Sequence, residues 1–366
     1  MKKIIFTVTN ELSQDQRMNR ICTSLANAGY DVLLVGRELR TSKPLIEKPY
    51  KQKRLFCFFT NGKLFYAEYN FRLFIFLFFQ NFDILCGIDL DTILPTYILA
   101  KIKRKPFVYD AHEYFTEMEE VVTRPFIKRA WKILEKMIVP GIKYGYTISE
   151  GYAEMFLKKY NVKFEIIRNA TVLNNNEQQT ANNEQYILYQ GSVNVGRGLE
   201  NLVEAMLQID CKLYVCGKGD ILNDMIMLTK KLNLDNKITF FGFVEPEKLK
   251  EYTRNAALGI TFFSNFGLSN YYSLANRFFD YLHSGVPQIA MSYPEYKNFN
   301  EKYEVAFLID DLKTETIVSA VNKLLNDNEC YNNLRDNCSE ARKEFNWQNE
   351  EKKLLKFYEN IISTVG

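Results

Sequence analysis

The chain has 366 residues, of which 47% are hydrophobic and 25% charged, and this composition excludes a disordered protein and predicts two globular domains. Its longest apolar run, Leu73 to Phe79, is far shorter than the roughly 20 residues that span a bilayer. Seven cysteines without any CxxC spacing exclude a disulfide framework or zinc site, and we expect a cytoplasmic protein. The net charge of +3 conceals an asymmetry, because residues 1–170 hold 27 Lys and Arg against 18 Asp and Glu.

The first half alternates short apolar runs with segments of helical period. The N-terminal KIIFTVTN predicts a strand, since it turns polar too quickly for a signal peptide, and a helix over residues 17–28 ends at Gly29. Further strands are expected at YDVLLVG, FDILCGI, PFVYDAH, YGYTIS and FEIIRN. Strands this uniformly apolar are buried on both faces, which predicts a parallel sheet covered by helices.

Two basic clusters stand out in this half, at residues 101–106 and 128–143. In the second, Trp131, Leu134 and Ile138 recur at helical intervals among lysines, as in a helix that lies on a membrane surface. The alternative is a solvated helix whose apolar stripe packs on the core. Peripheral membrane contact therefore stays a hypothesis, whereas nucleic acid is not expected, because no binding motif accompanies the charge.

The second half begins with a polar, Asn-rich segment at 171–185 that predicts a linker between domains. The alternation then restarts, with strands expected at YILYQG, CKLYVCG, KITFFGFV, ALGITFF, PQIAM and EVAFLID. Helices are expected over 198–207 and 220–232, from Pro246, and from Ser273, and three helical stretches close the chain. This pattern predicts a second doubly wound α/β domain.

The first strand-to-helix turn, TNELSQDQRMNR, contains no glycine and thus argues against a GxGxxG dinucleotide site. The second half offers two glycine clusters instead, QGSVNVGRG and the weaker CGKGD. In the first of these, Gly196 and Gly198 flank Arg197 at the start of a helix. Backbone amides and a guanidinium at a helix start suit a diphosphate. A flexible loop with a solvent-exposed arginine agrees equally well with this sequence.

The segment SNYYSLANRFFDYLHSGVPQIA predicts a helix capped by Ser273 and ended by Gly285. Asn276, Arg277 and Asp280 fall on nearby faces of its first turns. A carboxylate at this place can accept both hydroxyls of a ribose. Because Asp280 stands between two aromatic residues, a partnered carboxylate is favoured over a plain surface residue.

In the first half, VYDAHEYF places Asp110, His112 and Glu113 at the carboxyl end of a strand, where open α/β sheets bind ligands. His112 is therefore a functional candidate, whereas His283 lies late in a helix and is expected to be structural. The Asp-x-Asp at 89–91 precedes TILPTYILA, which predicts a loop and helix cap rather than a metal site.

These segments together resemble the retaining glycosyltransferase family 4, and within it a bacterial branch common in polysaccharide biosynthesis. The resemblance rests on DQRMNRICTSLANAGYDV, DLDTILPTYILAKIKRKPFVYDAHEYFTE, QGSVNVGRGLENL and SLANRFFDYLHSGVPQIA. It implies the GT-B fold, with two Rossmann-like parallel-sheet domains facing a cleft. Residues 1–169 would form the acceptor domain, to which a C-terminal helix at about 348–366 returns, and residues 170–347 the nucleotide-sugar donor domain.

The resemblance also implies roles for individual residues. Arg197 stands where the family contacts the donor diphosphate, Asp280 where it binds the ribose, and His112 where it faces the transferred sugar, and these three form the implied catalytic set. The implied donor-binding set is Gly191, Ser192, Gly198, Gly217, Gly242, Phe243, Tyr272, Ser273, Asn276 and Arg277, with Gly242 and Phe243 at the nucleobase. The implied acceptor side is Asp15, Arg17 and Glu113.

The implied reaction is transfer of a hexose-type sugar from a UDP- or GDP-sugar to a glycan or lipid-linked acceptor, with retention and without metal or cofactor. The sequence departs from the family in four places: Tyr272 replaces the first acid of the Glu-x7-Glu motif, Asp280 shortens the second, and Ser192 replaces an arginine. The family's glycine-rich first loop is also missing, which leaves Asp15 and Arg17 there. Two alternatives remain open, a non-catalytic GT-B module that acts as a partner subunit and a GT-B nucleotide-sugar epimerase.

Overall fold

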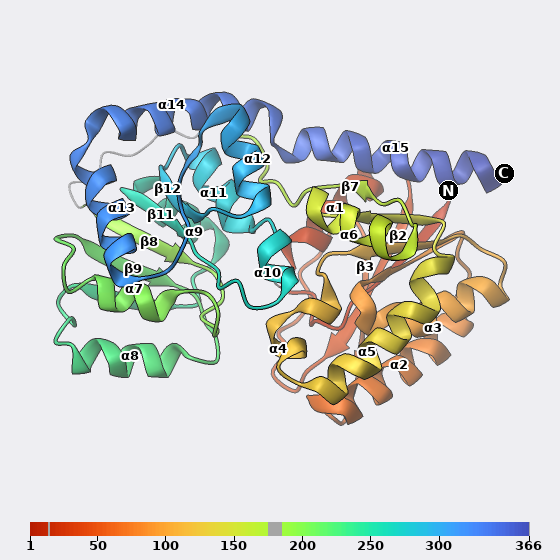
Figure 1. Ribbon diagram of the computed structural model, residues 1–366. Helices are drawn as coiled ribbons and strands as arrows, with labels where there is room; N and C mark the ends of the chain where they lie inside the picture. The colour runs from red at the N-terminus through yellow and green to blue at the C-terminus, as the bar shows by residue number, and fades with distance from the viewer. Residues whose placement is uncertain (14, 175–184, 366) are drawn as a thin grey trace. The chain divides into compact units, whose positions relative to one another are not determined.

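The computed structural model describes residues 1–13, 15–174 and 185–365, so most of the predicted linker lies outside the described residues. The chain divides into two compact units (Figure 1). Unit 1 comprises Met1–Asn169 with Glu350–Gly366, and unit 2 comprises Ala170–Asn349. Each unit is built on its own parallel sheet.

The sheet of unit 1 has seven strands: β1 (Lys3–Thr7), β2 (Asp31–Glu38), β3 (Lys51–Phe56), β4 (Ile84–Ile88), β5 (Phe107–Ala111), β6 (Tyr144–Thr147) and β7 (Glu165–Ile166). They pair in the order β3-β2-β1-β4-β5-β6-β7, all parallel. The strand β4 is buried throughout, as its uninterrupted apolar sequence predicts. The strand β3 was not predicted, because its edge position allows the polar sequence KQKRLF.

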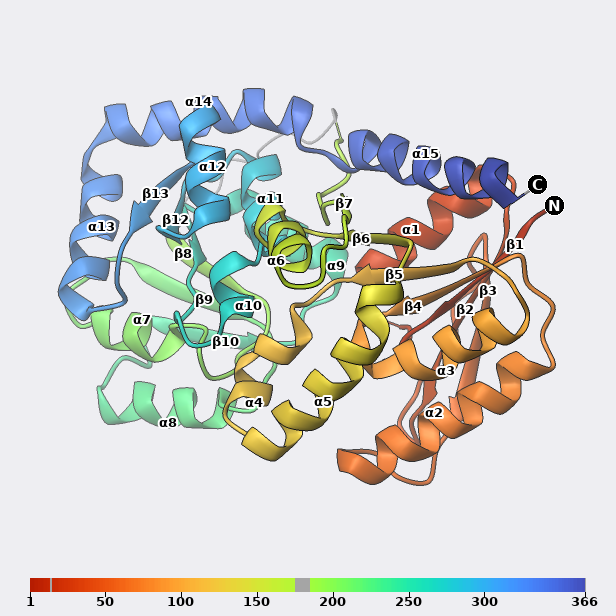
Figure 2. The same ribbon diagram turned by 45° about the vertical axis from the view of Figure 1, so that its right-hand side comes forward.

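Helices cover both faces of this sheet. The main ones are α1 (Gln16–Asn27), α2 (Gly62–Phe78), α3 (Asp89–Ile102), α5 (Pro125–Ile138), α6 (Glu150–Tyr160) and α15 (Trp347–Val365), with a short α4 (Glu119–Val122) before α5. In Figures 1 and 2, α2, α3 and α5 lie side by side on one face of the sheet, and α1 and α15 lie on the other. Tyr358 of α15 packs edge-on against Phe6 of β1 and Tyr146 of β6, so α15 completes the core of unit 1.

The sheet of unit 2 has six strands: β8 (Tyr186–Gln190), β9 (Lys212–Cys216), β10 (Ile238–Gly242), β11 (Leu258–Thr261), β12 (Gln288–Met291) and β13 (Ala306–Ile309). They pair in the order β10-β9-β8-β11-β12-β13, again all parallel. Its helices are α7 (Leu199–Ala205), α8 (Leu222–Lys231), α9 (Pro246–Asn255), α10 (Leu268–Tyr272), α11 (Asn276–Ser284), α12 (Pro294–Tyr303), α13 (Thr314–Asn326) and α14 (Asn328–Glu344). Two doubly wound α/β domains were predicted, and the structure confirms them.

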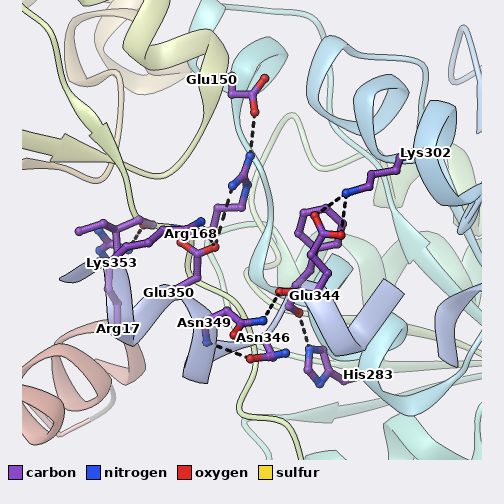
Figure 3. Close-up of polar contacts among 12 residues, drawn as sticks. Arg17, Glu150, Arg168, His283, Lys302, Glu344, Asn346, Asn349, Glu350 and Lys353 are labelled. Carbon is purple, nitrogen blue, oxygen red and sulfur yellow. Dashed lines mark hydrogen bonds and ion pairs between the residues drawn. The ribbon is translucent and has the colours of Figure 1, made fainter. Parts of the chain in front are cut away.

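The helix α15 begins with three residues of unit 2 and continues in unit 1 from Glu350 onward. At its start, the backbone N–H of Trp347 donates to the carbonyl of Thr171. One turn later, the carboxylate of Glu350 accepts from the backbone N–H of Arg168 at 2.9 Å and from the ammonium of Lys353 at 2.8 Å (Figure 3). The segments in which the chain passes between the units are therefore hydrogen-bonded to each other.

Both sheets reverse their winding direction at one point. In unit 1 the reversal lies between β1 and β4, and in unit 2 between β8 and β11. Open α/β sheets bind ligands outside the carboxyl ends of the strands at such a switch point. The fold thus indicates one candidate site in each unit.

Two expectations from composition can be compared with the structure. All seven cysteines are free thiols, as their spacing predicts. Among the residues that the structure describes, no helix is both long enough and apolar enough to cross a bilayer.

Candidate functional site

Arg277, in the first turn of α11, ties together the two strand ends at the switch point of unit 2. Its Nη1 donates to the carbonyl of Gln190 at 3.1 Å, and its Nη2 donates to the carbonyl of Phe262 at 2.8 Å. Only 7% of the residue is exposed, and its Nε has no hydrogen-bond partner among the described residues. The guanidinium is therefore a buried cation held by backbone dipoles.

Glycines shape the loops that follow β8 and β9. Gly191 has φ 120°, and its N–H donates to the carbonyl of Cys216. A Cβ on Gly217 would lie 1.8 Å from the carbonyl oxygen of Gly191, and one on Gly198 would lie 2.9 Å from the Cβ of Phe262. Gly191 and Gly198 adopt left-handed backbone conformations that a side chain would strain, and Gly217 is required by the close approach of the two loops.

Arg197 and Lys218 bring two further cations to this edge of the sheet. The Arg197 guanidinium lies over the ring of Phe263 at 4.8 Å, and its Nη1 is 3.4 Å from Oδ1 of Asn270. The Lys218 ammonium lies 5.6 Å from the ring centre of Phe243. Phe243 directly follows Gly242, the last residue of β10, which has φ 64°. Sequence reasoning missed Lys218, because CGKGD was weighed for its glycines alone.

Asp280, in the second turn of α11, is the partnered carboxylate that was predicted. Its Oδ1 accepts from Oγ1 of Thr171 at 2.8 Å, and its Oδ2 accepts from Nε2 of Gln190 at 2.9 Å. Gln190 in turn accepts from the hydroxyl of Thr253 at 2.7 Å. Asp280 is half-buried, so its carboxylate is partly accessible from solvent.

The predicted cap at Ser273 is wrong. The helix α10 ends at Tyr272, and α11 begins only at Asn276, with Ala275 as its uncapped preceding residue. Ser273 is extended, with φ −79° and ψ 158°, and its hydroxyl donates to the carbonyl of Asn270. The physical reason is Leu274, which is buried in the core and separates the two helices. The ring of Tyr272 contacts that of Tyr271, with 4.9 Å between their centres.

Unit 1 has a cavity of about 240 Å³ at its own switch point. Residues that follow β1, β4 and β5 line it, together with the first turn of α1: Val8, Thr9, Asn10, Asp15, Arg17, Met18, Ile88, Asp89, Asp91 and His112. Three sequence candidates, Asp15, Arg17 and His112, thus come together. Glu113 does not line the cavity, and its backbone N–H donates to Oδ1 of Asp89 at 2.9 Å.

Two of these candidates are engaged within unit 1. Arg17 donates from Nε and Nη2 to the carboxylate of Asp110, at 3.2 and 2.8 Å, and from Nη1 to the carbonyl of Ile167. Both members of this ion pair are buried. Asp15 caps α1 by accepting from the N–H of Met18 at 2.9 Å. Arg17 and Asp15 therefore build the wall of the cavity.

Asp89 and Asp91 belong to the first turn of α3, whereas a loop and cap were predicted. Asp89 has φ 52°, an uncommon conformation for a residue with a side chain. Burial, together with the charges of Asp91 and Glu113, raises the pKa of Asp89. Burial also raises the pKa of Asp91 to about 6, although a hydrogen bond from Thr9 opposes this shift.

His112 faces Asp89 across the cavity, with 4.0 Å between its Nδ1 and Oδ2 of the carboxylate. Burial and the nearby charges of Arg17 and Arg20 lower the pKa of His112 well below its usual range. The imidazole is therefore neutral at pH 7. Among the described residues, no three or more His, Cys, Asp and Glu side chains form a group that could hold a metal ion.

His283 lies in unit 2 and has the structural place that was expected. Its Nε2 is 2.8 Å from the carbonyl oxygen of Phe345, beyond the end of α14 (Figure 3).

Comparison with known proteins gives matches to sugar-transferring enzymes. Residues 173–345 match the family model described as Glycosyl transferases group 1. The chain is 29% identical over 121 residues to N-acetylgalactosamine-N,N'-diacetylbacillosaminyl-diphospho-undecaprenol 4-alpha-N-acetylgalactosaminyltransferase of Campylobacter jejuni. The aligned segment covers 31% of this chain and 33% of that protein. It is 32% identical over 77 residues to an uncharacterized glycosyltransferase of Methanocaldococcus jannaschii, or 20% of each chain. The chain thus spans about a third and a fifth of these relatives.

Solved structures are similar over nearly the whole chain. Sucrose-phosphate synthase from Thermosynechococcus elongatus superposes with a TM-score of 0.82 at 16% identity, over all of both chains. Anabaena HepE in complex with UDP and glucose gives 0.78 at 13% identity, over 98% of this chain and 100% of that one. WaaG, a glycosyltransferase involved in lipopolysaccharide biosynthesis, gives 0.72 at 15% identity, over 96% and 98%. At these identities the likeness shows the fold, which is GT-B.

Proposed function

Residues 173–345 match the family model of the glycosyl transferases group 1 and the fold is GT-B, and from this premise we propose that the protein transfers a hexose-type sugar from a UDP- or GDP-sugar to a glycan or lipid-linked acceptor. We assign the donor to unit 2 and the acceptor to unit 1. The proposal includes retention of anomeric configuration, independence of metal and cofactor, and a place in cell-surface polysaccharide biosynthesis.

The observation that carries this proposal is the set of cations at the carboxyl ends of the strands of unit 2. Arg277, Arg197 and Lys218 lie around the glycine loops, and none of the three forms an ion pair with a carboxylate among the described residues. Cations without carboxylate partners, beside backbone that approaches closely, suit the phosphates of a nucleotide. The donor phosphates are therefore the ligand that this edge of the sheet fits best.

Each residue of unit 2 then has a chemical role. As the bond to the sugar breaks, negative charge grows on the leaving diphosphate, and the guanidinium of Arg197 stabilises it electrostatically. Arg277 holds the ends of β8 and β11 in place. Its positive charge also contributes to the electrostatic stabilisation of the diphosphate. Asp280, whose carboxylate is held by Thr171 and Gln190, accepts the ribose hydroxyls.

In unit 1, His112 positions the transferred sugar and the acceptor. A neutral imidazole can donate one hydrogen bond and accept another, so it can orient two hydroxyls without acting as an obligatory base. Asp89 and Asp91 line the same cavity and can accept hydrogen bonds from acceptor hydroxyls. Asp15, Arg17 and Glu113 shape this side of the site rather than transfer protons.

The test is a binding experiment with nucleotides. Thermal unfolding is followed with UDP, GDP, CMP and NAD, for the wild type and for Arg197→Ala and Asp280→Ala, with Lys231→Ala on the exposed end of α8 as the matched control. A ligand that binds only the folded state raises the melting temperature by mass action. We expect UDP or GDP to stabilise the wild type and the control, and to stabilise the two site variants much less.

Other outcomes would redirect the proposal. Stabilisation by NAD alone would overturn it. Absence of any nucleotide effect would favour the non-catalytic module, which the replacement of the family's acid by Tyr272 and of its arginine by Ser192 also favours. Slow hydrolysis of a nucleotide sugar by the isolated protein would count against that module, and interconversion of two nucleotide sugars would indicate an epimerase.

A further inference from the structure

Unit 1 exposes an unusual number of large apolar side chains on α2. Leu64, Phe71, Ile75 and Phe78 are all exposed, and their spacing of seven, four and three residues places them on one side of the helix. Phe71 is 66% exposed, and Phe79, which ends the helix, is 76% exposed. The opposite side of α2 packs on the sheet through other residues, so this outer stripe is not needed for the core.

The helices α3 and α5 each carry a stripe of the same kind. On α3, Leu94, Ile98 and Ile102 recur every four residues. On α5, Phe126, Ile133 and Met137 recur at seven and four residues, and Phe126 is 88% exposed. All of these side chains point away from the core, because their helices bury other positions.

The predicted stripe on α5 is a different one. Trp131 packs edge-on against Tyr66 of α2 and Phe115, at 5.6 and 4.9 Å, and Ile138 is buried. The stripe of Trp131, Leu134 and Ile138 therefore faces inward. This agrees with the alternative interpretation of the sequence, in which the apolar stripe of the helix packs on the core. The outer stripe of α5 was not predicted, because the sequence analysis identified a single apolar side of this helix, the one with Trp131, Leu134 and Ile138.

The three stripes belong to neighbouring helices. The ring contact between Tyr66 and Trp131 joins α2 to α5, and Figures 1 and 2 both show α3 beside them on the same side of the sheet. We call the combined surface the apolar helical face, made of Leu64, Phe71, Ile75, Phe78, Phe79, Leu94, Ile98, Ile102, Phe126, Ile133 and Met137. So many exposed large apolar side chains on neighbouring helices indicate an interaction site.

The exposed charged residues of α2, α3 and α5 are all basic. Arg129 and Lys136 alternate with Ile133 and Met137 on the exposed side of α5, while Lys63 and Lys101 flank the stripes of α2 and α3. The carboxylates on these three helices are engaged elsewhere. Glu68 accepts from Arg72 and from the backbone of residues 58 and 59, Glu135 is buried against Lys159, and Asp89 and Asp91 line the cavity.

Apolar side chains interleaved with exposed cations fit the surface of an anionic bilayer, where rings and aliphatic chains enter the interface and cations meet lipid phosphates. A second copy of this chain fits less well, because the same positive face would meet itself. We propose that the apolar helical face of α2, α3 and α5 docks unit 1 onto a membrane that contains anionic phospholipids. The inference is independent of the transfer reaction.

The test is co-sedimentation of the full chain with vesicles of equal parts phosphatidylglycerol and phosphatidylcholine, and with vesicles of phosphatidylcholine alone. Two variants probe the two features: Phe71→Ser with Phe78→Ser and Ile133→Ser removes apolar contacts, and Arg129→Glu with Lys136→Glu reverses charge. The matched control is Leu207→Ser with Met227→Ser, which removes exposed apolar residues from unit 2.

We expect the wild type and the control to bind anionic vesicles, and each test variant to bind at least about tenfold more weakly, since a basic residue near an anionic surface contributes roughly fivefold or more. Binding of the wild type should also weaken in high salt. All substituted residues are exposed, and unchanged far-ultraviolet circular dichroism together with an unchanged thermal shift by UDP or GDP would show that the fold and the donor site are intact.

Several results would overturn the proposal. Equal binding to neutral and anionic vesicles, or binding that neither variant weakens, would exclude the apolar helical face as the docking surface. A wild-type dimer that the apolar variant dissociates without any loss of vesicle binding, measured by light scattering, would assign the face to a second copy of the chain. Loss of the nucleotide effect in the wild type would count against the transferase and leave this inference standing.

Discussion

In unit 1 the winding reverses between β1 and β4, and in unit 2 between β8 and β11, so the two sheets offer comparable places for a ligand. The chemistry placed there differs. The cavity of unit 1 is lined by Asp15, Asp89 and Asp91 with a neutral His112, whereas the edge of unit 2 carries cations. One winding rule thus produces an acidic site and a cationic site, because the residues that follow the strands decide the charge.

A buried arginine near each switch point sharpens this difference. In unit 1, Arg17 is neutralised by the buried carboxylate of Asp110. In unit 2, Arg277 is held by the carbonyls of Gln190 and Phe262, so no carboxylate cancels its charge. The first arginine can serve only the architecture, while the second can serve both the architecture and an anionic ligand.

The largest expected effect is that of Arg17→Ala in unit 1. It leaves the carboxylate of Asp110 buried without its cation, which costs about 3–5 kcal/mol. The double change Arg17→Met with Asp110→Asn should recover most of this loss. The measurement is urea unfolding followed by the fluorescence of Trp131 in a Trp347→Phe background, since these are the chain's two tryptophans and lie in different units. Full stability of the single variant would contradict the structural role.

Arg277→Met should cost less, about 2–4 kcal/mol, because it leaves two carbonyl groups without donors but leaves no unpaired charge. The loss should appear in the unfolding of unit 2, followed by Trp347 in a Trp131→Phe background. Nucleoside diphosphate binding should fall as well. Equal losses of unfolding free energy in Arg17→Ala and Arg277→Met would contradict the proposed difference between the two arginines.

Asp91→Asn should change the pH dependence of unit 1. Because the pKa of Asp91 is raised from 3.8 to about 6, the folded state holds this proton more tightly than the unfolded chain does. The stabilisation is present below about pH 4 and is lost as the pH rises towards 6. The variant should remove this loss, worth about 3 kcal/mol, and be more stable than the wild type at pH 7. Asp235→Asn, exposed in unit 2, is the control, and urea unfolding from pH 4 to 7 is the measurement.

The smallest expected effect is a gain. Ser192 is exposed in the loop after β8, next to Gly191, and Ser192→Arg would add a cation to the cationic edge of unit 2. Binding of UDP or GDP should tighten about fivefold, as expected for one charge-assisted hydrogen bond that is partly screened by solvent. Titration calorimetry with Ser192→Ala as control measures it. An unchanged or weaker affinity in Ser192→Arg would place the phosphates elsewhere.

Much of the fold could be predicted from the sequence, because strands buried on both faces are recognisable as apolar runs. The strand β4, ILCGI, is such a case. The helix α9 could be predicted for another reason, since Pro246 marks its first turn. The strand β3 could not be found this way, since it lies at the sheet edge and its polar sequence has no distinctive period. The prediction that a helix starts at Ser273 was wrong, because the buried Leu274 lies in a break between α10 and α11 that local helix propensity does not indicate.

The sites were less predictable than the fold. Asp280 and Arg197 could be selected because they stand in short local motifs. The surroundings of Asp89 depend on β1 lying beside β4, residues some 80 positions apart in the chain, and no local pattern reports that adjacency. Arg277 was selected from the sequence, but its contacts, like those of the loop that carries Lys218, join strand ends and loops that meet only in the folded unit.

The return of α15 to unit 1 has a consequence for how the protein is made. Leu354, Tyr358 and Ile361 fill the core of unit 1, yet the ribosome adds them after every residue of unit 2. Unit 2 is one uninterrupted segment and can close its core as soon as it has been synthesised. Unit 1, although begun first, must wait with an incomplete core. We therefore expect the two halves to complete their cores in the reverse of the order in which their synthesis begins, with the half that carries the apolar helical face completed last.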